Sequence, residues 1–265
     1  MNEVSPRRLP ALAYEKVWGA PDTEPWFRNP EGRNIGEIWF SASDAVPLLV
    51  KFLFTSGKLS VQVHPGDEYA RVRHQSCGKT EMWHILRAQP GAKIALGLRE
   101  SMTPERFREA ARTGAIMESL NWIPVGPGDT FFIPAGIIHA IGEGIALCEV
   151  QQRSDITYRI YDYERGRELH VDDAVAVSRL DSDEGAAQCA LPVECVYFKT
   201  ERLVVEGSWV SAPARRNTLY IALEGEGLLA DRPFQAGEAW EVDAGSTPFE
   251  IRSAHATFLV TAEPS

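Results

Sequence analysis

Side chains with nitrogen and oxygen donors recur at ligand-like positions in the middle of the chain. In KLSVQVHPGDEY, strand alternation puts Gln62 and His64 on one face and the neighbouring valines on the other. GKTEMWHIL adds Glu81, and in GDTFFIPAGIIHA a proline-glycine turn is followed by His139. Amide, imidazole and carboxylate donors together are typical of zinc or another first-row divalent metal with one position left open for substrate. The sequence therefore predicts that these four residues form a metal centre.

Each of these residues also has an ordinary structural explanation when it is taken alone. A histidine beside a proline is more often a hydrogen-bonded rim residue than a ligand, and a single glutamate in a strand is usually solvated. Their convergence favours the metal, because a carboxylate buried without a partner would be costly and an ion supplies that partner.

Strand alternation around Glu81 sorts its neighbours onto two faces. Lys79 and Trp83 share the face of Glu81. His84 has the opposite parity and is expected to point away from the metal. The remaining histidines are expected to be structural or on the surface; they are His74, His170 and His255.

Two cations lie in otherwise apolar segments. Lys51 stands in LLVKFLF, where an unpaired ammonium would be costly, so we expect it to face a cavity or an anion. The alternative is a side chain that reaches solvent at a strand edge. Arg159 stands in DITYRIYDY, where a buried ion pair with Asp155 is an alternative that is compatible with a catalytic role.

The elements that must position these side chains are mostly strands. Segments such as LSVQVHP, AKIALGL and IALCEVQ alternate at period two or form short apolar runs bounded by glycine, proline or aspartate, which predicts a sandwich or jelly roll. Two helices are expected as well. One begins after Thr103 with Pro104 at its first position and ends at Gly114, and the other begins near Asp172 and Asp173 in LHVDDAVAVSRL.

The last third of the chain repeats the middle in outline. The matching pairs are MWHIL (82–86) with LYIAL (219–223), and GDTFFIPAG (128–136) with GEAWEVDAG (237–245). In this alignment Glu81 falls opposite Thr218, and His139 falls opposite Pro248. Because the scaffold is repeated and the polar residues are not, Glu81 and His139 should serve a role local to the first copy.

Composition excludes several classes of partner. The 265 residues are 44% hydrophobic and 24% charged, as in an ordinary globular protein, and the net charge of -10 argues against a nucleic-acid partner. An anionic ligand would therefore have to be held by local cations. The longest apolar run, AVPLLVKFLF, is too short to span a bilayer and the start has no secretory signal, so we expect a cytoplasmic protein with no membrane partner. The four cysteines lack zinc-ribbon or redox-pair spacing and are expected to be reduced.

Several linked motifs resemble a known family. The pattern G-x5-P-x-G-x2-H over 128–139 is the second motif of the cupin superfamily, except that Glu143 stands where asparagine is usual. The first cupin motif is met poorly, since Gln62 replaces its first histidine and Glu81 arrives late. These departures are shared with type I phosphomannose isomerases of the short bacterial form, which the chain resembles over residues 14–178. The passages that carry the resemblance are KFLFTSGKLSVQVHP, GKTEMWHIL, GDTFFIPAGIIHAIGEG and EVQQRSDITYRIYDY.

The resemblance implies a mostly β cupin jelly roll with a few short helices over residues 1–180. A degenerate, cupin-like β-domain without metal ligands is expected over residues 181–265, where by analogy it caps the catalytic barrel. The resemblance also implies a phosphosugar substrate, namely mannose 6-phosphate interconverted with fructose 6-phosphate, and one zinc ion per chain. The implied zinc ligands are Gln62, His64, Glu81 and His139. The implied catalytic residues are Lys51, Lys79, Glu149, Asp155 and Arg159, and we assign the phosphate to Ser60, Lys51 and Arg153.

Aldose–ketose isomerisation by the enediol route needs a base, a proton relay and a cation for the developing oxyanion. Zinc and Arg159 suit the oxyanion, and either Lys79 or Glu149 suits the proton transfer. Two alternatives remain. A metal cupin with other chemistry, such as an oxygenase, is disfavoured by the glutamine ligand and the lysine–arginine set. A non-catalytic sugar-binding bicupin is disfavoured by the intact ligand set.

Overall fold

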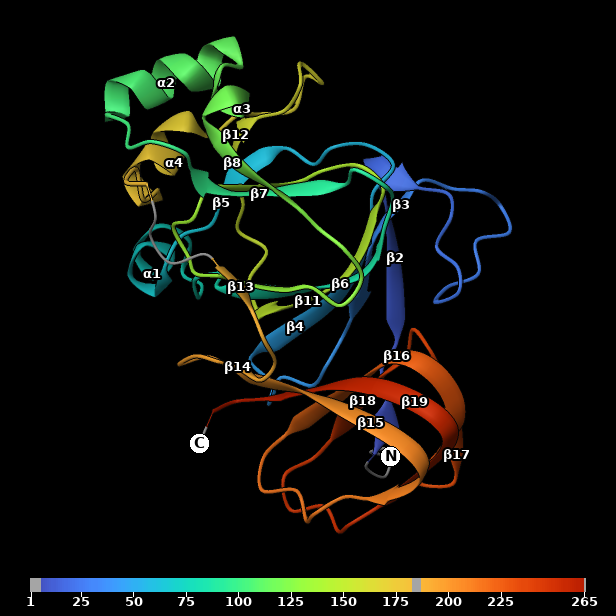
Figure 1. The fold of residues 1–265 in the computed structure, drawn as a ribbon. Helices are drawn as coiled ribbons and strands as arrows, with labels where there is room; N and C mark the ends of the chain where they lie inside the picture. The colour runs from blue at the N-terminus through green and yellow to red at the C-terminus, as the bar shows by residue number, and fades with distance from the viewer. Residues whose placement is uncertain (1–5, 183–186, 265) are drawn as a thin grey trace.

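The computed structural model describes residues 6–182 and 187–264, which form antiparallel sheets with short helices at one end (Figure 1). The predicted mostly β architecture is confirmed. A five-stranded sheet runs in the order β12 (Tyr158–Tyr161), β5 (Val61–Val63), β10 (His139–Ile141), β7 (Lys93–Leu98) and β8 (Leu120–Pro124). A seven-stranded sheet runs in the order β13 (Ala187–Cys189), β9 (Thr130–Ile133), β6 (Glu81–Ala88), β11 (Ile145–Gln152), β4 (Leu48–Phe54), β3 (Ile35–Phe40) and β2 (Ala11–Ala20).

A third sheet lies against the outer face of the seven-stranded one (Figure 1). Its order is β1 (Arg7–Arg8), β18 (Ala239–Val242), β16 (Thr218–Leu229), β19 (Glu250–Ala262), β15 (Lys199–Val210) and β14 (Val193–Glu194), and β17 (Arg232–Gln235) pairs with β16. Phe52, Met82 and Val150 pack in one core with Phe198 and Leu219 of the C-terminal part. The seven-stranded sheet is therefore covered on both faces, and β11 is buried along its whole length.

The predicted repeat is confirmed by strand order and register. The order β9-β6-β11-β4 of the first copy recurs as β18-β16-β19-β15 in the second. Glu81 of β6 pairs with Ile133 of β9, and at the aligned positions Thr218 of β16 pairs with Val242 of β18. Two copies of one strand arrangement thus carry different polar residues.

The sheets exchange strands across the expected boundary at residue 180. β1, near the N-terminus, pairs with β18 of the third sheet, whereas β13, which follows residue 180, pairs with β9. The division into 1–180 and 181–265 stays a prediction of how the chain folds into units.

Four helices occur in the described part of the chain: α1 (Asp67–His74), α2 (Pro104–Thr113), α3 (Ile116–Ser119) and α4 (Val171–Val177). The two predicted helices are α2 and α4. As predicted, Thr103 caps α2 by accepting a hydrogen bond from the Arg106 amide, and Gly114 ends it with a φ of 80°. Sequence patterning missed α1, whose sequence DEYARVRH is mostly charged, and α3, which has only four residues, because neither shows an apolar stripe with a 3.6-residue period. In the described ranges, no helix is long and apolar enough to cross a membrane.

His84 points away from the candidate metal ligands, as its parity predicts. His84 is 8% exposed, its Nδ1 lies 2.9 Å from Thr130 Oγ1, and it lines a crevice between the seven-stranded sheet and the third sheet together with Arg202 and Glu224. Burial, assisted by the charge of Arg202, lowers the pKa of His84 from its usual value of 6.5 to about 4. The unfolded chain therefore takes up a proton at His84 below pH 6.5 that the folded protein does not accept until about pH 4, so stability is lost as the pH falls through this window.

Substitution of His84 by glutamine should reduce this acid sensitivity. Between pH 7 and pH 5 the free energy of unfolding should fall by about 2 kcal/mol less in H84Q than in the parent. Glutamine does not titrate, so the unfolded chain no longer gains a proton at this position. Urea unfolding curves at both pH values measure the difference. His255, which is half exposed in the third sheet, provides the control H255Q. Equal pH dependence in H84Q and the parent would contradict this assignment.

Candidate metal centre

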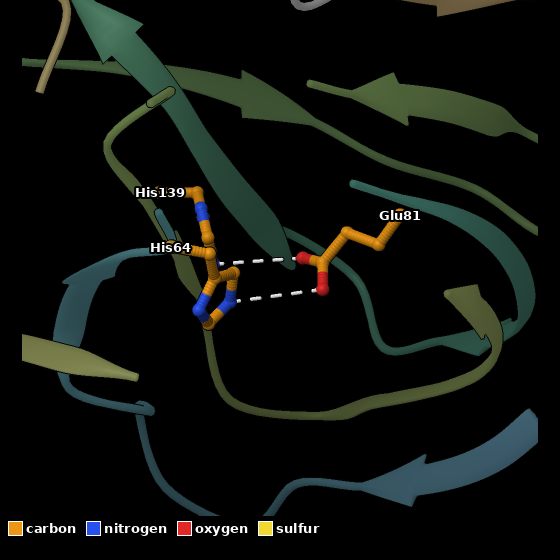
Figure 2. Close-up of side chains that lie close together, drawn as sticks. All are labelled: His64, Glu81 and His139. Atoms are coloured by element: carbon orange, nitrogen blue, oxygen red, sulfur yellow. Dashed lines mark ion pairs between the residues drawn. The ribbon is translucent and has the colours of Figure 1, made fainter. Parts of the chain in front are cut away.

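Three of the four predicted ligands meet at one buried point (Figure 2). His64 follows β5, Glu81 begins β6 and His139 begins β10, so the five-stranded sheet and the seven-stranded sheet that contains β6 both contribute. One ligand atom from each residue lies within 4.8 Å of the others. Glu81 Oε1 is 3.5 Å from His139 Nε2, and Glu81 Oε2 is 3.7 Å from His64 Nε2.

Gln62 is brought to the same place by strand pairing. It lies directly opposite His139 in the β5–β10 register, and its amide Nε2 is 3.2 Å from His139 Nε2. Its other amide atom, Oε1, accepts a hydrogen bond of 3.4 Å from the Ser60 hydroxyl. The structure thus brings together all four residues predicted to be ligands.

Backbone carbonyls orient both imidazoles. His64 Nδ1 lies 2.8 Å from the Ile156 carbonyl oxygen, and His139 Nδ1 lies 2.9 Å from that of Ile137. A carbonyl oxygen only accepts, so each Nδ1 carries the proton and each Nε2 presents a lone pair toward Glu81. Burial lowers the pKa of His64 well below its usual value and that of His139 to about 4, so both rings are neutral at physiological pH.

Glu81 is fully buried, and one of its carboxylate oxygens is left without a partner. Oε1 forms no hydrogen bond to any described residue, whereas Oε2 accepts one of 2.5 Å from Lys79 Nζ. Burial raises the pKa of Glu81 to about 8 although Lys79 opposes the shift. An unpaired carboxylate oxygen, two imidazole lone pairs and an amide form a donor set that fits a first-row divalent cation.

Lys79, Lys51 and Glu149 form a charged group beside this cluster. Glu149 Oε2 is 3.5 Å from Lys51 Nζ, and Glu149 Oε1 is 3.8 Å from Lys79 Nζ and accepts a 3.1 Å hydrogen bond from Trp83. Burial alone would raise the pKa of Glu149, but the two ammonium groups outweigh it and bring the value to about 2. Glu149 is therefore ionised, and its single negative charge is shared between two ammonium groups.

These charged residues open into a cavity of about 350 Å3. Of the predicted site residues, its wall includes Lys51, Ser60, Gln62, Lys79, Glu149, Asp155 and Arg159. Five cationic and three anionic side chains line it, so the cavity carries an excess of positive charge inside an acidic protein. Such a cavity suits an anionic ligand.

Arg159 lies in this wall, and part of its guanidinium group has no hydrogen-bond partner in the described structure. Its guanidinium donates to the Glu168 carbonyl oxygen at 2.9 Å, and its buried Nε has no hydrogen-bond partner among the residues described. The alternative ion pair between Arg159 and Asp155 does not form in the described structure.

Arg153 lies elsewhere, and its expected phosphate role does not fit this placement. Its guanidinium donates to the carbonyl oxygens of Ser43 and Ala42 at 2.8 and 3.0 Å and pairs with Asp44 at 3.4 Å. The physical reason is that β11 ends at Gln152 and the chain bends at Arg153, so the alternation that would turn its side chain inward is broken.

Sequence reasoning missed most of one cavity wall. This wall comes from β2, β3 and the segment around β12, and its missed residues are Tyr14, Lys16, Trp18, Glu37, Trp39, Thr157 and Arg167. They carry no ligand-like spacing, so only their place in the fold identifies them.

A close backbone approach supports the segment that carries Lys79 and Glu81. The Gly78 amide donates a 2.8 Å hydrogen bond to Asp67 Oδ1, and a Cβ at Gly78 would lie 2.6 Å from the Asp67 nitrogen. Gln152 donates to the same Asp67 oxygen and accepts from the Thr80 amide. Glycine is thus required at the turn that positions Lys79 and Glu81.

Comparison with known proteins finds curated relatives of this chain. No protein-family model matches it. It is 35% identical over 251 residues to the mannose-6-phosphate isomerase ManA of Bacillus subtilis, covering 83% of this chain and 79% of that protein. It is 39% identical over 160 residues to the mannose-6-phosphate isomerase of Streptococcus mutans, covering 58% of this chain and 50% of that protein.

The fold agrees with solved structures. The mannose 6-phosphate isomerase of Bacillus subtilis superposes with a TM-score of 0.84 at 26% identity, over 97% of this chain and 99% of that one. A phosphomannose isomerase variant of Salmonella typhimurium has the same fold, with a TM-score of 0.75 at 14% identity over 97% and 99% of the two chains. The chain is therefore a cupin-fold protein. More specifically, it belongs to the mannose-6-phosphate isomerase family and is an isomerase.

Alanine at Gly78 should destabilise the protein and disturb the site. The added methyl group would force the backbone at Asp67 to move, which should lower the free energy of unfolding by about 1–3 kcal/mol. Gly57→Ala is the matched control, because its methyl group would meet no atom closer than 3.6 Å. Urea unfolding of both variants measures the effect, and equal stabilities would show that the approach at Gly78 is not a constraint.

Proposed function

We propose that this chain is a zinc-dependent enzyme that interconverts mannose 6-phosphate and fructose 6-phosphate through an enediol. The observation that carries the proposal is the buried oxygen of Glu81, unpartnered in the described structure, which faces two neutral imidazoles beside a cationic cavity. The names of the curated relatives supply the reaction. The residues that would hold one zinc ion are Gln62, His64, Glu81 and His139.

The excess positive charge of the cavity supports a phosphosugar as the substrate. Lys51 and Ser60 lie in its wall and would hold the phosphate. We leave Arg153 out of the phosphate site because its guanidinium binds the 42–44 loop. The cytoplasmic location expected from the sequence is kept as part of this proposal.

The reaction moves protons between neighbouring carbons and oxygens. From aldose to ketose, a base takes the proton from C2, the electrons of that C–H bond form the C1–C2 double bond, and O1 gains a proton. A proton then returns to C1 while the O2 hydroxyl loses its own. Zinc, when bound, would polarise the sugar oxygens and stabilise the negative charge that develops on them.

Two residues beside the candidate ligands suit the proton transfers. Glu149 is ionised and can accept a proton, and Lys79, whose pKa Glu149 and Glu81 raise against the effect of burial, can donate one. An anion bound at Lys51 would offset one of the two cations that hold the pKa of Glu149 down, and so would make Glu149 a stronger base. We therefore assign acid and base to this pair.

Arg159 and Asp155 complete the cavity wall. The unpartnered Nε–H of Arg159 is available to an oxygen that gains negative charge. Asp155 can accept a hydrogen bond from a sugar hydroxyl and so orient the chain of the substrate.

A coupled assay tests this function. Conversion of mannose 6-phosphate to glucose 6-phosphate through added phosphoglucose isomerase should require zinc, stop on chelation and resume when zinc is restored. An absence of turnover in folded, metal-replete protein would exclude the isomerase and leave the sugar-binding bicupin. Purification with iron and consumption of dioxygen would favour the oxygenase.

Two substitutions separate metal binding from catalysis. His139→Ala should lose bound zinc and activity together, because it removes a ligand. Arg159→Ala should retain zinc and lose turnover by about 10²–10³-fold, the scale for removal of one electrostatic contact to the transition state. Metal content by elemental analysis and kcat by the coupled assay measure the two effects. His255→Ala, in the third sheet, is the control; an Arg159→Ala enzyme as active as this control would contradict the assigned role.

A further inference from the structure

A row of side chains crosses the inner face of the seven-stranded sheet. Strand register places Trp39 of β3 opposite Lys51 of β4, Lys51 opposite Glu149 of β11, and Glu149 opposite Trp83 of β6. Their side chains contact one another in the same order. The Lys51 ammonium lies 4.3 Å from the centre of the Trp39 ring and 3.5 Å from Glu149 Oε2, and Trp83 donates to Glu149 Oε1.

Lys51 needs more than Glu149 to hold its charge. It is 5% exposed, and Glu149 is shared with Lys79, whose Nζ lies 3.8 Å from the other carboxylate oxygen. Burial lowers the pKa of Lys51 and the charge of Lys79 lowers it further, while Glu149, Glu37 and Glu81 raise it. The face of an indole ring attracts an ammonium without neutralising it, so the Trp39 contact stabilises Lys51 and leaves its positive charge in the cavity.

The ring of Trp39 is itself held in place. Its Nε1 donates a 3.0 Å hydrogen bond to Glu37 Oε2, and the same oxygen pairs with Lys16 Nζ at 3.0 Å. Tyr14 of β2 packs against it with ring centres 4.9 Å apart. These contacts fix the ring from the side that faces solvent, and Lys51 lies toward the interior.

We propose that Trp39 is the positioning residue of Lys51. Its ring face holds the ammonium beside Glu149, charged and open to the cavity, so that it can bind the phosphate of the sugar. The inference rests on the proposed function, since it concerns how that substrate is held. It adds a residue that has no ligand-like or acid–base chemistry of its own.

The test compares two substitutions of Trp39. Trp39→Phe keeps an aromatic face, whereas Trp39→Leu keeps apolar packing without one. The KM for mannose 6-phosphate should rise about tenfold in W39L and about threefold or less in W39F, with kcat within about threefold of the parent in both. Isothermal titration of mannose 6-phosphate into the chelated, metal-free proteins should show the same order of affinities. Trp39→Met serves the same comparison if W39L does not fold.

A second measurement asks whether Trp39 acts through Lys51. In the Lys51→Met background, W39L should cause no further loss of affinity, because the ammonium on which the ring acts is gone. Trp209→Leu, at a partly buried tryptophan of the third sheet, is the control and should leave KM unchanged. Additive effects of W39L and Lys51→Met, or equal KM values in W39F and W39L, would overturn the proposal. Absence of turnover in the parent would instead contradict the proposed function, and the titrations would still decide the role of Trp39.

Discussion

The opposition of a buried carboxylate and two imidazole lone pairs is the constraint on which the rest of this structure depends. Glu81 faces His64 and His139 at less than 4 Å, and each neutral ring has its proton on Nδ1, so that Nε2 directs a lone pair at the carboxyl group. Such an arrangement is stable only if positive charge lies among the three groups. Lys79 supplies part of it by donating to both Glu81 and His64, and the unpartnered oxygen of Glu81 in the described structure marks where more is needed.

Much of the surrounding fold holds these groups against their mutual repulsion. The carbonyl oxygens of Ile137 and Ile156 set the imidazole orientation, and the turn at Gly78 sets Lys79 and Glu81. The seven-stranded sheet that carries Glu81 and Glu149 is packed on both faces, because the third sheet covers its outer side. The second copy of the repeat thus covers the outer face of the first with apolar side chains.

Strand alternation predicted the polar face correctly in β5 and β6 and at the residues that flank them. Gln62, His64, Lys79 and Glu81 are found together because the period of two is a property of the extended backbone and does not depend on the rest of the fold. Arg153 shows the limit. It follows Glu149 and Gln151 at the right parity, but the chain bends at Arg153, so its guanidinium binds the loop at Ala42 and Ser43. The eight-residue helix α1 was missed for a local reason as well, since its mostly charged sequence shows no apolar stripe.

The sequence by itself determined which side chains share a strand face, the repeat with its two different sets of polar residues, and the family. These depend on local backbone geometry and on motifs close along the chain. Only the tertiary structure decided that Lys16, Glu37 and Trp39 form a wall of the same cavity as Arg159, more than a hundred residues away. The physical reason is that strand order and register, set by which hydrophobic faces pack together, bring distant segments side by side. No local pattern encodes that proximity.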